Sequence, residues 1–128
     1  MENRTQLLNG ILPIIEGSKA TDSDNESFQN DVLRPILKFQ NDIIILYFKH
    51  FLIETKIDFE KLKHSHKVTK VHDLFKTNIQ FKQFCVGLIV GYFSTVEFEY
   101  YTENKKEINK RIIAMLIERI CSQLENIK

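Results

Sequence analysis

Four histidines are the residues of this sequence with the widest choice of chemistry. His64, His66 and His72 lie within one short stretch, and His50 precedes Glu54 by one helical turn. Imidazole nitrogens bind zinc or iron, but such a site needs three or four ligands that converge on the ion. In a metal hydrolase the H-x-H pattern continues toward Asp and His, but Val68 and Thr69 stand at those positions here, and no cysteine is near. The pattern therefore favours a solvated basic turn over a metal centre, with these three histidines as the metal-ligand candidates and no cofactor expected.

A second set of polar residues interrupts the most apolar helical segment. Gln40, Tyr47, His50 and Glu54 project toward the same side as several isoleucines and phenylalanines. Polar groups on an apolar side need hydrogen-bond partners. They either bond to neighbouring helices or reach water, or they line a small pocket in which His50 is a general base oriented by Glu54. Because His–Glu pairs at this spacing are common, the first interpretation is favoured.

The other reactive groups lack the surroundings that catalysis needs. No nucleophile elbow and no phosphate-binding glycine loop occurs in the sequence. Cys85 and Cys121 lie in apolar helical segments, which predicts unreactive thiols in a reducing cytosol. The basic stretch 61–70 contains lysines without arginines or interleaved aromatic residues, so nucleic-acid binding is disfavoured.

The elements that must position these residues are predicted to be helices throughout. Apolar residues recur every three or four positions, and hairpin signals are absent. Pro35 cannot donate a backbone hydrogen bond, so the longest pattern is expected to start or kink near it. A polar loop is expected at about 17–26. Helices are predicted at about 3–16, 25–55, 58–76 (as one or two), 79–94, 95–103 and from 104 toward the C-terminus.

Three short sequences predict where helices begin. Asn78 can cap the helix that follows it. Ser94 followed by Glu97, and Asn104 followed by Glu107, both have the spacing of a capping box.

Length and composition favour one compact domain spanning 1–128. The chain has 128 residues, of which 43% are hydrophobic and 27% charged, with a formal net charge of +1. This balance gives no global field that would attract nucleic acid or anionic lipid. No apolar run approaches the ~20 residues needed to cross a bilayer. We therefore expect a cytoplasmic all-α bundle of five to six helices.

Two features raise the question of whether apolar surface packs inside the chain or against a second copy. Residues 43–53 are apolar almost all round, with Ile45 and Leu52 on the far side. Gly87 and Gly91 lie one above the other on a predicted helix. Each interior glycine costs roughly 1 kcal/mol relative to alanine, so a structural reason is expected. Close packing in the core is the favoured reason, and the seam of a homodimer is the alternative.

Three segments resemble a group of small bacterial helical proteins, some of which carry a glyoxalase label. The segments are FQNDVLRPILKFQNDIIILYFKHFL, VGLIVGYFSTVEFEYY and NKRI, and the resemblance covers most of the chain. The label implies a metal-bound lyase or a thioester hydrolase. The hydrolase motif is H-x-H-x-D-H, and this sequence departs from it after His66. No catalytic residue follows from the resemblance.

The sequence thus predicts a non-enzymatic interaction or regulatory protein that forms a homodimer. The alternative is an enzyme or small-ligand binder that uses Gln40, His50 and Glu54. Weak binding of nucleic acid through 61–70 is a third interpretation.

Overall fold

The computed structural model describes residues 2–12 and 24–127, and no strand occurs within these ranges. The predicted all-α class is confirmed, whereas the predicted number of five to six helices is too low, because the described ranges contain eight α-helices. The elements are α1 (Glu2–Ile11), α2 (Asp24–Phe28), the π-helix η1 (Gln29–Leu33), α3 (Arg34–Phe39), α4 (Asn41–Glu54), the 3-10 helix η2 (Phe59–Lys61), α5 (His64–Thr77), α6 (Ile79–Val90), α7 (Thr95–Glu103), α8 (Lys105–Cys121) and the 3-10 helix η3 (Leu124–Asn126).

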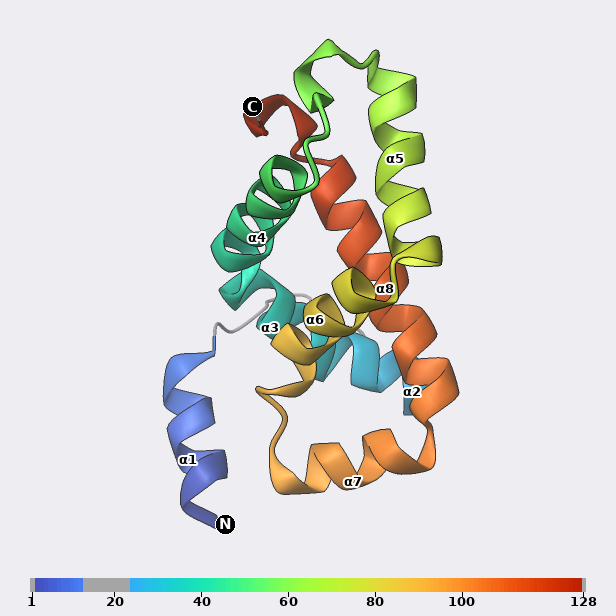
Figure 1. The fold of residues 1–128 in the computed structure, drawn as a ribbon. Helices are drawn as coiled ribbons and strands as arrows, with labels where there is room; N and C mark the ends of the chain where they lie inside the picture. Colours follow the sequence, from blue (N-terminus) through green and yellow to red (C-terminus); the bar gives the residue numbers. More distant parts are fainter. Residues whose placement is uncertain (1, 13–23, 128) are drawn as a thin grey trace.

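The helix α8 runs through the middle of the molecule (Figure 1). α4 and α5 flank its C-terminal half, α6 crosses it, and η1 packs against its N-terminal half. α7 closes one end of the molecule beside α8, whereas η3 lies at the other end. The inward side of α8 is a strict four-residue repeat of fully buried residues: Ile108, Ile112, Leu116 and Ile120.

Phe81 on α6 is the centre of an aromatic cluster in this core. It is fully buried, and its ring lies 4.8 Å from that of Phe51 and 4.9 Å from that of Phe75, measured between centroids. The rings of Tyr47 and Phe48 lie 5.6 Å and 6.1 Å away. Burying one such side chain stabilises the fold by about 1.5–3 kcal/mol, so this cluster contributes substantially to holding α4, α5 and α6 together.

A change of helix type precedes Pro35, at the place where the sequence predicted a start or a kink. The backbone from Phe28 to Arg34 keeps right-handed helical angles, but the Arg34 amide donates to the Gln29 carbonyl five residues back. α3 then begins with Pro35 in its first turn, where its missing N–H costs nothing.

A second break, which the sequence pattern did not predict, falls at Gln40. This residue ends α3 and begins α4 with φ −88° and ψ 3°. Its side-chain Nε2 donates to the Leu88 carbonyl at 3.0 Å. The Leu88 carbonyl lies in the last turn of α6, where the Tyr92 amide donates to Ile89 instead. Gln40 therefore satisfies a carbonyl at the end of a neighbouring helix.

Two of the three predicted helix starts have the expected bonds. The Asn78 side chain accepts from the Phe81 amide at 2.9 Å. Ser94 and Glu97 form the full capping box, with bonds of 3.2 Å and 2.8 Å. The capping box predicted at Asn104 is wrong, because the side-chain Nδ2 of Asn104 donates back to the Tyr100 carbonyl and the side chain caps no backbone amide of α8.

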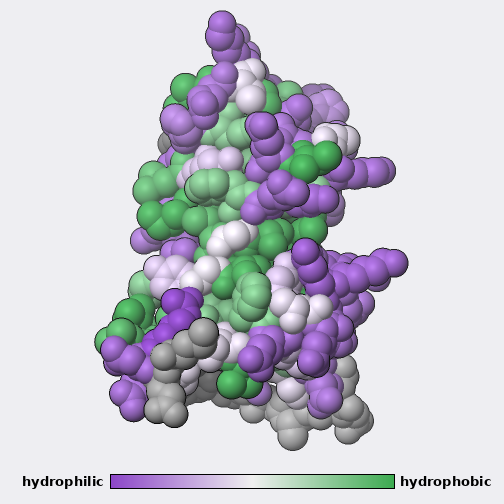
Figure 2. Space-filling view, turned by 60° about the horizontal axis from the view of Figure 1, so that its bottom comes forward, coloured by the Kyte–Doolittle hydropathy of each residue, from purple (hydrophilic) through white to green (hydrophobic). Residues whose placement is uncertain are grey.

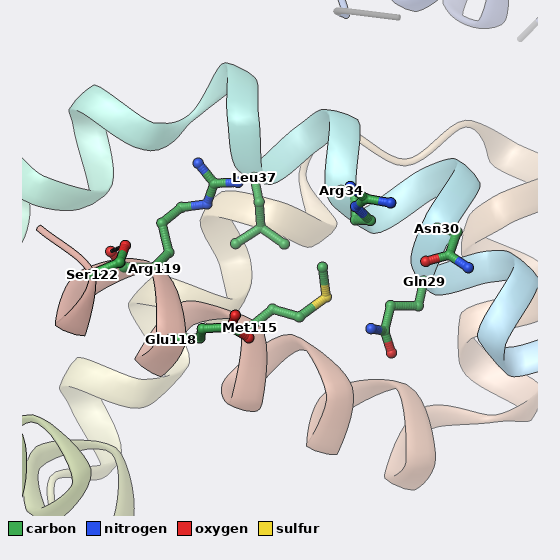
Figure 3. A pocket seen from close by; sticks show the side chains of 8 residues that line it. All are labelled: Gln29, Asn30, Arg34, Leu37, Met115, Glu118, Arg119 and Ser122. Carbon is green, nitrogen blue, oxygen red and sulfur yellow. Dashed lines mark hydrogen bonds between the residues drawn. The ribbon is translucent and has the colours of Figure 1, made fainter. Parts of the chain in front are cut away.

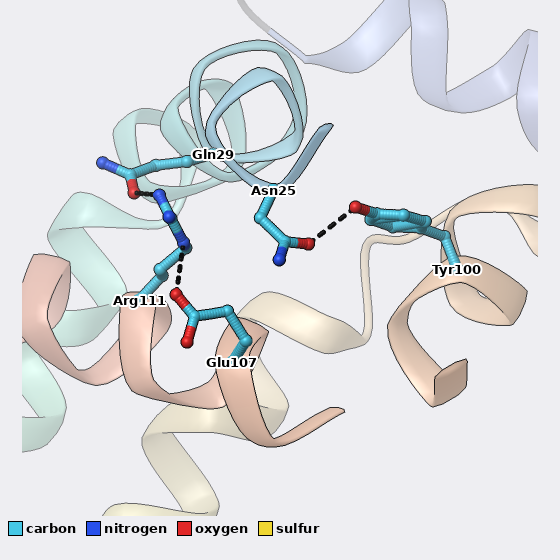
Figure 4. A network of polar contacts seen from close by, with 5 residues as sticks. All are labelled: Asn25, Gln29, Tyr100, Glu107 and Arg111. Carbon is cyan, nitrogen blue, oxygen red and sulfur yellow. Dashed lines mark hydrogen bonds and ion pairs between the residues drawn. The ribbon is translucent and has the colours of Figure 1, made fainter. Parts of the chain in front are cut away.

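Polar contacts attach the segment 24–33 to the C-terminal half of the chain (Figure 4). Arg111 on α8 bonds to Glu107 at 3.1 Å on its own helix and donates to the Gln29 oxygen at 2.8 Å. The Tyr100 hydroxyl on α7 donates to the Asn25 oxygen at 2.6 Å. These bonds fix α2 and η1 against α7 and α8.

An arginine of α1 attaches this helix to the C-terminal end of α6. The Arg4 guanidinium donates to the carbonyls of Gly91 at 2.6 Å and Phe93 at 2.8 Å. A cation is favourable there because carbonyls at a helix C-terminus carry partial negative charge. The predicted first helix agrees up to Ile11, and its remaining part, 13–16, lies outside the described residues.

The predicted loop at about 17–26 is described only in its last part. Residues 17–23 lie outside the described residues, and the prediction is wrong for 24–26, because α2 begins at Asp24. Among the described residues, no helix has both the length and the apolar character required to cross a membrane.

Candidate functional site

The outward side of α4 is apolar. Ile43 is 48% exposed, Leu46 59% and Ile53 75%. Phe39 lies four residues before Ile43 and is exposed as well. Residues at spacings of three, four and seven share one side of a helix, so Ile43, Leu46 and Ile53 form a single stripe facing water, and Phe39 at the end of α3 directly precedes it. A stripe of large exposed apolar residues marks an interaction site more often than chance exposure does.

The apolar surface continues from α4 onto α6. The Tyr47 ring stacks on Phe84 with centroids 4.0 Å apart, and the Phe39 ring contacts Tyr92 at 5.3 Å. Phe84 itself is exposed. Figure 2 shows apolar side chains gathered on this face of the molecule. We refer to the exposed residues Phe39, Ile43, Leu46, Ile53 and Phe84 together as the α4–α6 face.

Gly87 of α6 and Gly91, the residue that follows its end, lie three and seven positions after Phe84 and so border this face. Gly87 and Gly91 are both exposed. A Cβ atom added at Gly87 would meet nothing within 4 Å, whereas one at Gly91 would lie 3.1 Å from the Gly87 carbonyl oxygen. The prediction that the glycines allow close packing in the core is therefore wrong. The alternative, a seam with a second copy, stays a prediction.

Ile45 and Leu52 lie in the core of the chain itself. Both are buried, on the side of α4 that also carries the fully buried Phe48. The apolar circumference of 43–53 therefore divides into a buried half and the exposed stripe. The candidate interface consists of the stripe, and Ile45 and Leu52 do not belong to it.

The four polar candidates of the sequence do not surround one cavity. Gln40 is buried and bonded to the Leu88 carbonyl, whereas Tyr47 is half-buried between Phe81 and Phe84. The His50 Nε2 and Glu54 Oε1 atoms are 3.0 Å apart, but these side chains are 65% and 61% exposed. The structure thus brings His50 and Glu54 together as a surface pair and places Gln40 at the opposite end of α4.

The three other histidines lie along α5. His64, His66 and His72 are all exposed. Within the ranges 2–12 and 24–127, no three histidine, cysteine or carboxylate side chains lie close enough to hold a metal ion. In the basic stretch, Lys61 pairs with Asp58 at 3.3 Å and the Lys67 ammonium lies 5.4 Å from the centre of the Phe59 ring.

Both cysteines are free thiols in apolar surroundings. Burial raises the pKa of Cys121, and it raises the pKa of Cys85 to about 12. The expected lack of reactivity agrees with these directions, because the thiolate is the nucleophile.

We expect the raised pKa of Cys85 to make stability fall in alkaline solution. An unfolded thiol ionises near pH 8.5, so the folded state favours the protonated form. The resulting stabilisation is complete below about pH 8.5 and is lost as the pH rises toward 12. Urea unfolding measures the free energy of unfolding of wild type and of Cys85→Ala at pH 7 and at pH 10. Between these two pH values, we expect the difference between the two proteins to change by about 2 kcal/mol in favour of the variant. An unchanged difference would show that Cys85 titrates normally in the fold.

The spacing of apolar residues in the sequence, rather than their number, indicates the exposed stripe. Phe39, Ile43, Leu46, His50 and Ile53 alternate spacings of four and three, which is the pattern of a coiled-coil seam. Whether that seam faces the core or water depends on which side of α4 the other helices cover.

Comparisons with protein-family models, with curated proteins and with solved structures find no match to this chain.

Proposed function

We propose that this protein is a non-enzymatic interaction protein of the cytosol that associates with a second copy of itself through the α4–α6 face. The observation that carries the proposal is the exposed stripe on α4, which continues onto Phe84 of α6. The two free cysteines support a reducing compartment.

The size of the α4–α6 face supports a specific interface. At about 200 Å² for a large apolar residue, the exposed fractions of its five side chains correspond to roughly 540 Å² of apolar surface in water. This value lies in the upper part of the range for the largest patch on a typical monomer, roughly 300–600 Å², and such patches are often functional. A stable interface buries about 800 Å² per partner, including its polar rim. Tyr47 and Glu54 border the stripe and supply part of that rim.

The pattern of the stripe supports a second copy as the occupant. Side chains spaced by four and three interdigitate with the same pattern on a second helix. A twofold axis presents identical surfaces to each other, so a stripe that fits itself needs no other partner. Lys49 and Glu54 lie on opposite flanks of the stripe, five residues apart. When two α4 helices run in the same direction, these positions bring opposite charges together across the seam.

Gly87 offers a test that leaves the fold intact. We expect Gly87→Leu to dissociate the dimer, because the new side chain fills space that the partner needs. The same variant should be about 1 kcal/mol more stable as a monomer, because leucine is a better helix former and meets no neighbour in the chain. Sedimentation velocity across a range of concentrations measures the first effect, and thermal unfolding at low concentration measures the second.

Gly91→Leu is the less informative variant, because its Cβ would press on the Gly87 carbonyl within the same chain. A wild-type protein that sediments as a monomer at all concentrations would overturn the proposal. A Gly87→Leu variant that remains dimeric would exclude the glycine border from the interface.

A further inference from the structure

A cavity of about 520 Å³ lies between the segment η1–α3 and the C-terminal half of α8 (Figure 3). This volume falls within the range of small-molecule sites, about 300–1,000 Å³. Leu37 and Met115 give it an apolar floor, and polar side chains form the remainder of its lining. The α4–α6 face consists of other residues, so this cavity is independent of the proposed self-association.

Two arginines from different helices reach the cavity. Figure 3 shows Arg34 from α3 and Arg119 from α8 on either side of Leu37. Arg119 donates to the Asn41 oxygen at 3.3 Å, which is a long bond. The Arg34 guanidinium has no hydrogen bond or ion pair within the part of the chain that the structure describes. Arg34 therefore keeps all its donors for a ligand.

The electrostatics at Arg119 show that the two cations affect each other. Burial lowers the pKa of Arg119, Glu118 raises it, and Arg34 lowers it. Two arginines stand against one carboxylate in the lining, so the cavity carries excess positive charge. An anion bound between them would relieve their repulsion.

Neutral donors complete the lining. The Gln29 oxygen accepts a bond from Arg111 at 2.8 Å, which fixes the side-chain amide with its nitrogen turned toward the cavity. Asn30 and Ser122 lie at its edges. Glu118 can accept a bond from a hydroxyl or amino group of the ligand but repels a second anionic group.

We propose that this cavity binds a small doubly charged anion, either a phosphate monoester or a dicarboxylate, with Arg34 and Arg119 holding its oxygens. Guanidinium groups match both anions because they offer paired donors in one plane. Gln29 donates a further hydrogen bond to the anion, and Glu118 repels ligands that carry an additional anionic group.

Isothermal titration calorimetry of the full chain at fixed ionic strength tests this site. The probes are inorganic phosphate, glycerol 3-phosphate and succinate. Titration with the same concentration of chloride is the control for nonspecific binding of anions. Binding of the two phosphates without succinate identifies a phosphate site, and binding of succinate without them identifies a dicarboxylate site. The proposal is overturned when no probe binds at millimolar concentration.

Three variants make the test specific to the cavity. Arg34→Gln should weaken binding about ten-fold or more, and it removes no bond that the fold uses. Glu118→Gln should strengthen binding of inorganic phosphate about two- to five-fold, because it removes a repulsive charge. Lys110→Gln, an equal loss of charge on an exposed position of α8, should change nothing. Equal affinity in wild type and Arg34→Gln would show that the anion binds elsewhere.

Discussion

Replacing Phe81 by alanine is expected to lower the free energy of unfolding by about 3–5 kcal/mol. The side chain is fully buried, and it contacts rings from two neighbouring helices: Tyr47, Phe48 and Phe51 on α4, and Phe75 on α5. Truncation removes the packing of all these rings at once and leaves a cavity that rigid helices cannot close. Because a domain of this size has a total stability of about 5–15 kcal/mol, the variant should be close to unfolding at 37 °C.

Urea unfolding followed by circular dichroism measures this loss. Phe98→Ala is the matched control, since Phe98 is a half-exposed phenylalanine on α7 whose truncation should cost about 1 kcal/mol. Equal losses in the two variants would mean that the aromatic cluster around Phe81 is not the centre of the core.

Replacing Leu46 by glutamate is expected to weaken self-association by about 100-fold or more. This prediction depends on the proposed function. Leu46 lies in the middle of the stripe and is largely exposed in the monomer, so the variant should fold with nearly unchanged stability. In a twofold interface every substitution acts twice, and each glutamate would lose its hydration without gaining a partner.

Analytical ultracentrifugation of wild type and Leu46→Glu gives the two dissociation constants. Val96→Glu is the matched control, because it places the same charge on an exposed apolar position of α7, away from the α4–α6 face. Should wild type form a dimer that Leu46→Glu leaves intact, self-association would use another surface. A loss of dimer in both variants would indicate an effect of net charge rather than of the stripe.

The surface and the cavity differ in how far the sequence could reveal them. The α4 stripe is local, since its spacing can be read directly from residues 39–53, although its exposure cannot. The cavity combines Arg34 with Arg119, which stand far apart in the sequence. No periodicity joins two such positions, so the sequence offered no signal for this site. For the polar candidates Gln40 and His50, the sequence pattern instead suggested a shared pocket that does not exist. Both lie on one side of the predicted helix, but the length of α4 keeps them apart.

The sequence by itself determined the helical class, the core repeat of α8 and most helix boundaries, because these depend on interactions within a few residues. Apolar spacing selects the inward side of a helix, and Asn78 and Ser94 satisfy amides within one turn. Tertiary structure alone decided that Gly87 faces outward and that Ile45 is buried while Leu46 is exposed. It also decided that Gln40 interrupts the helix predicted over 25–55. Each of these outcomes depends on which neighbouring helix covers which side, and that is settled by the packing of the whole chain.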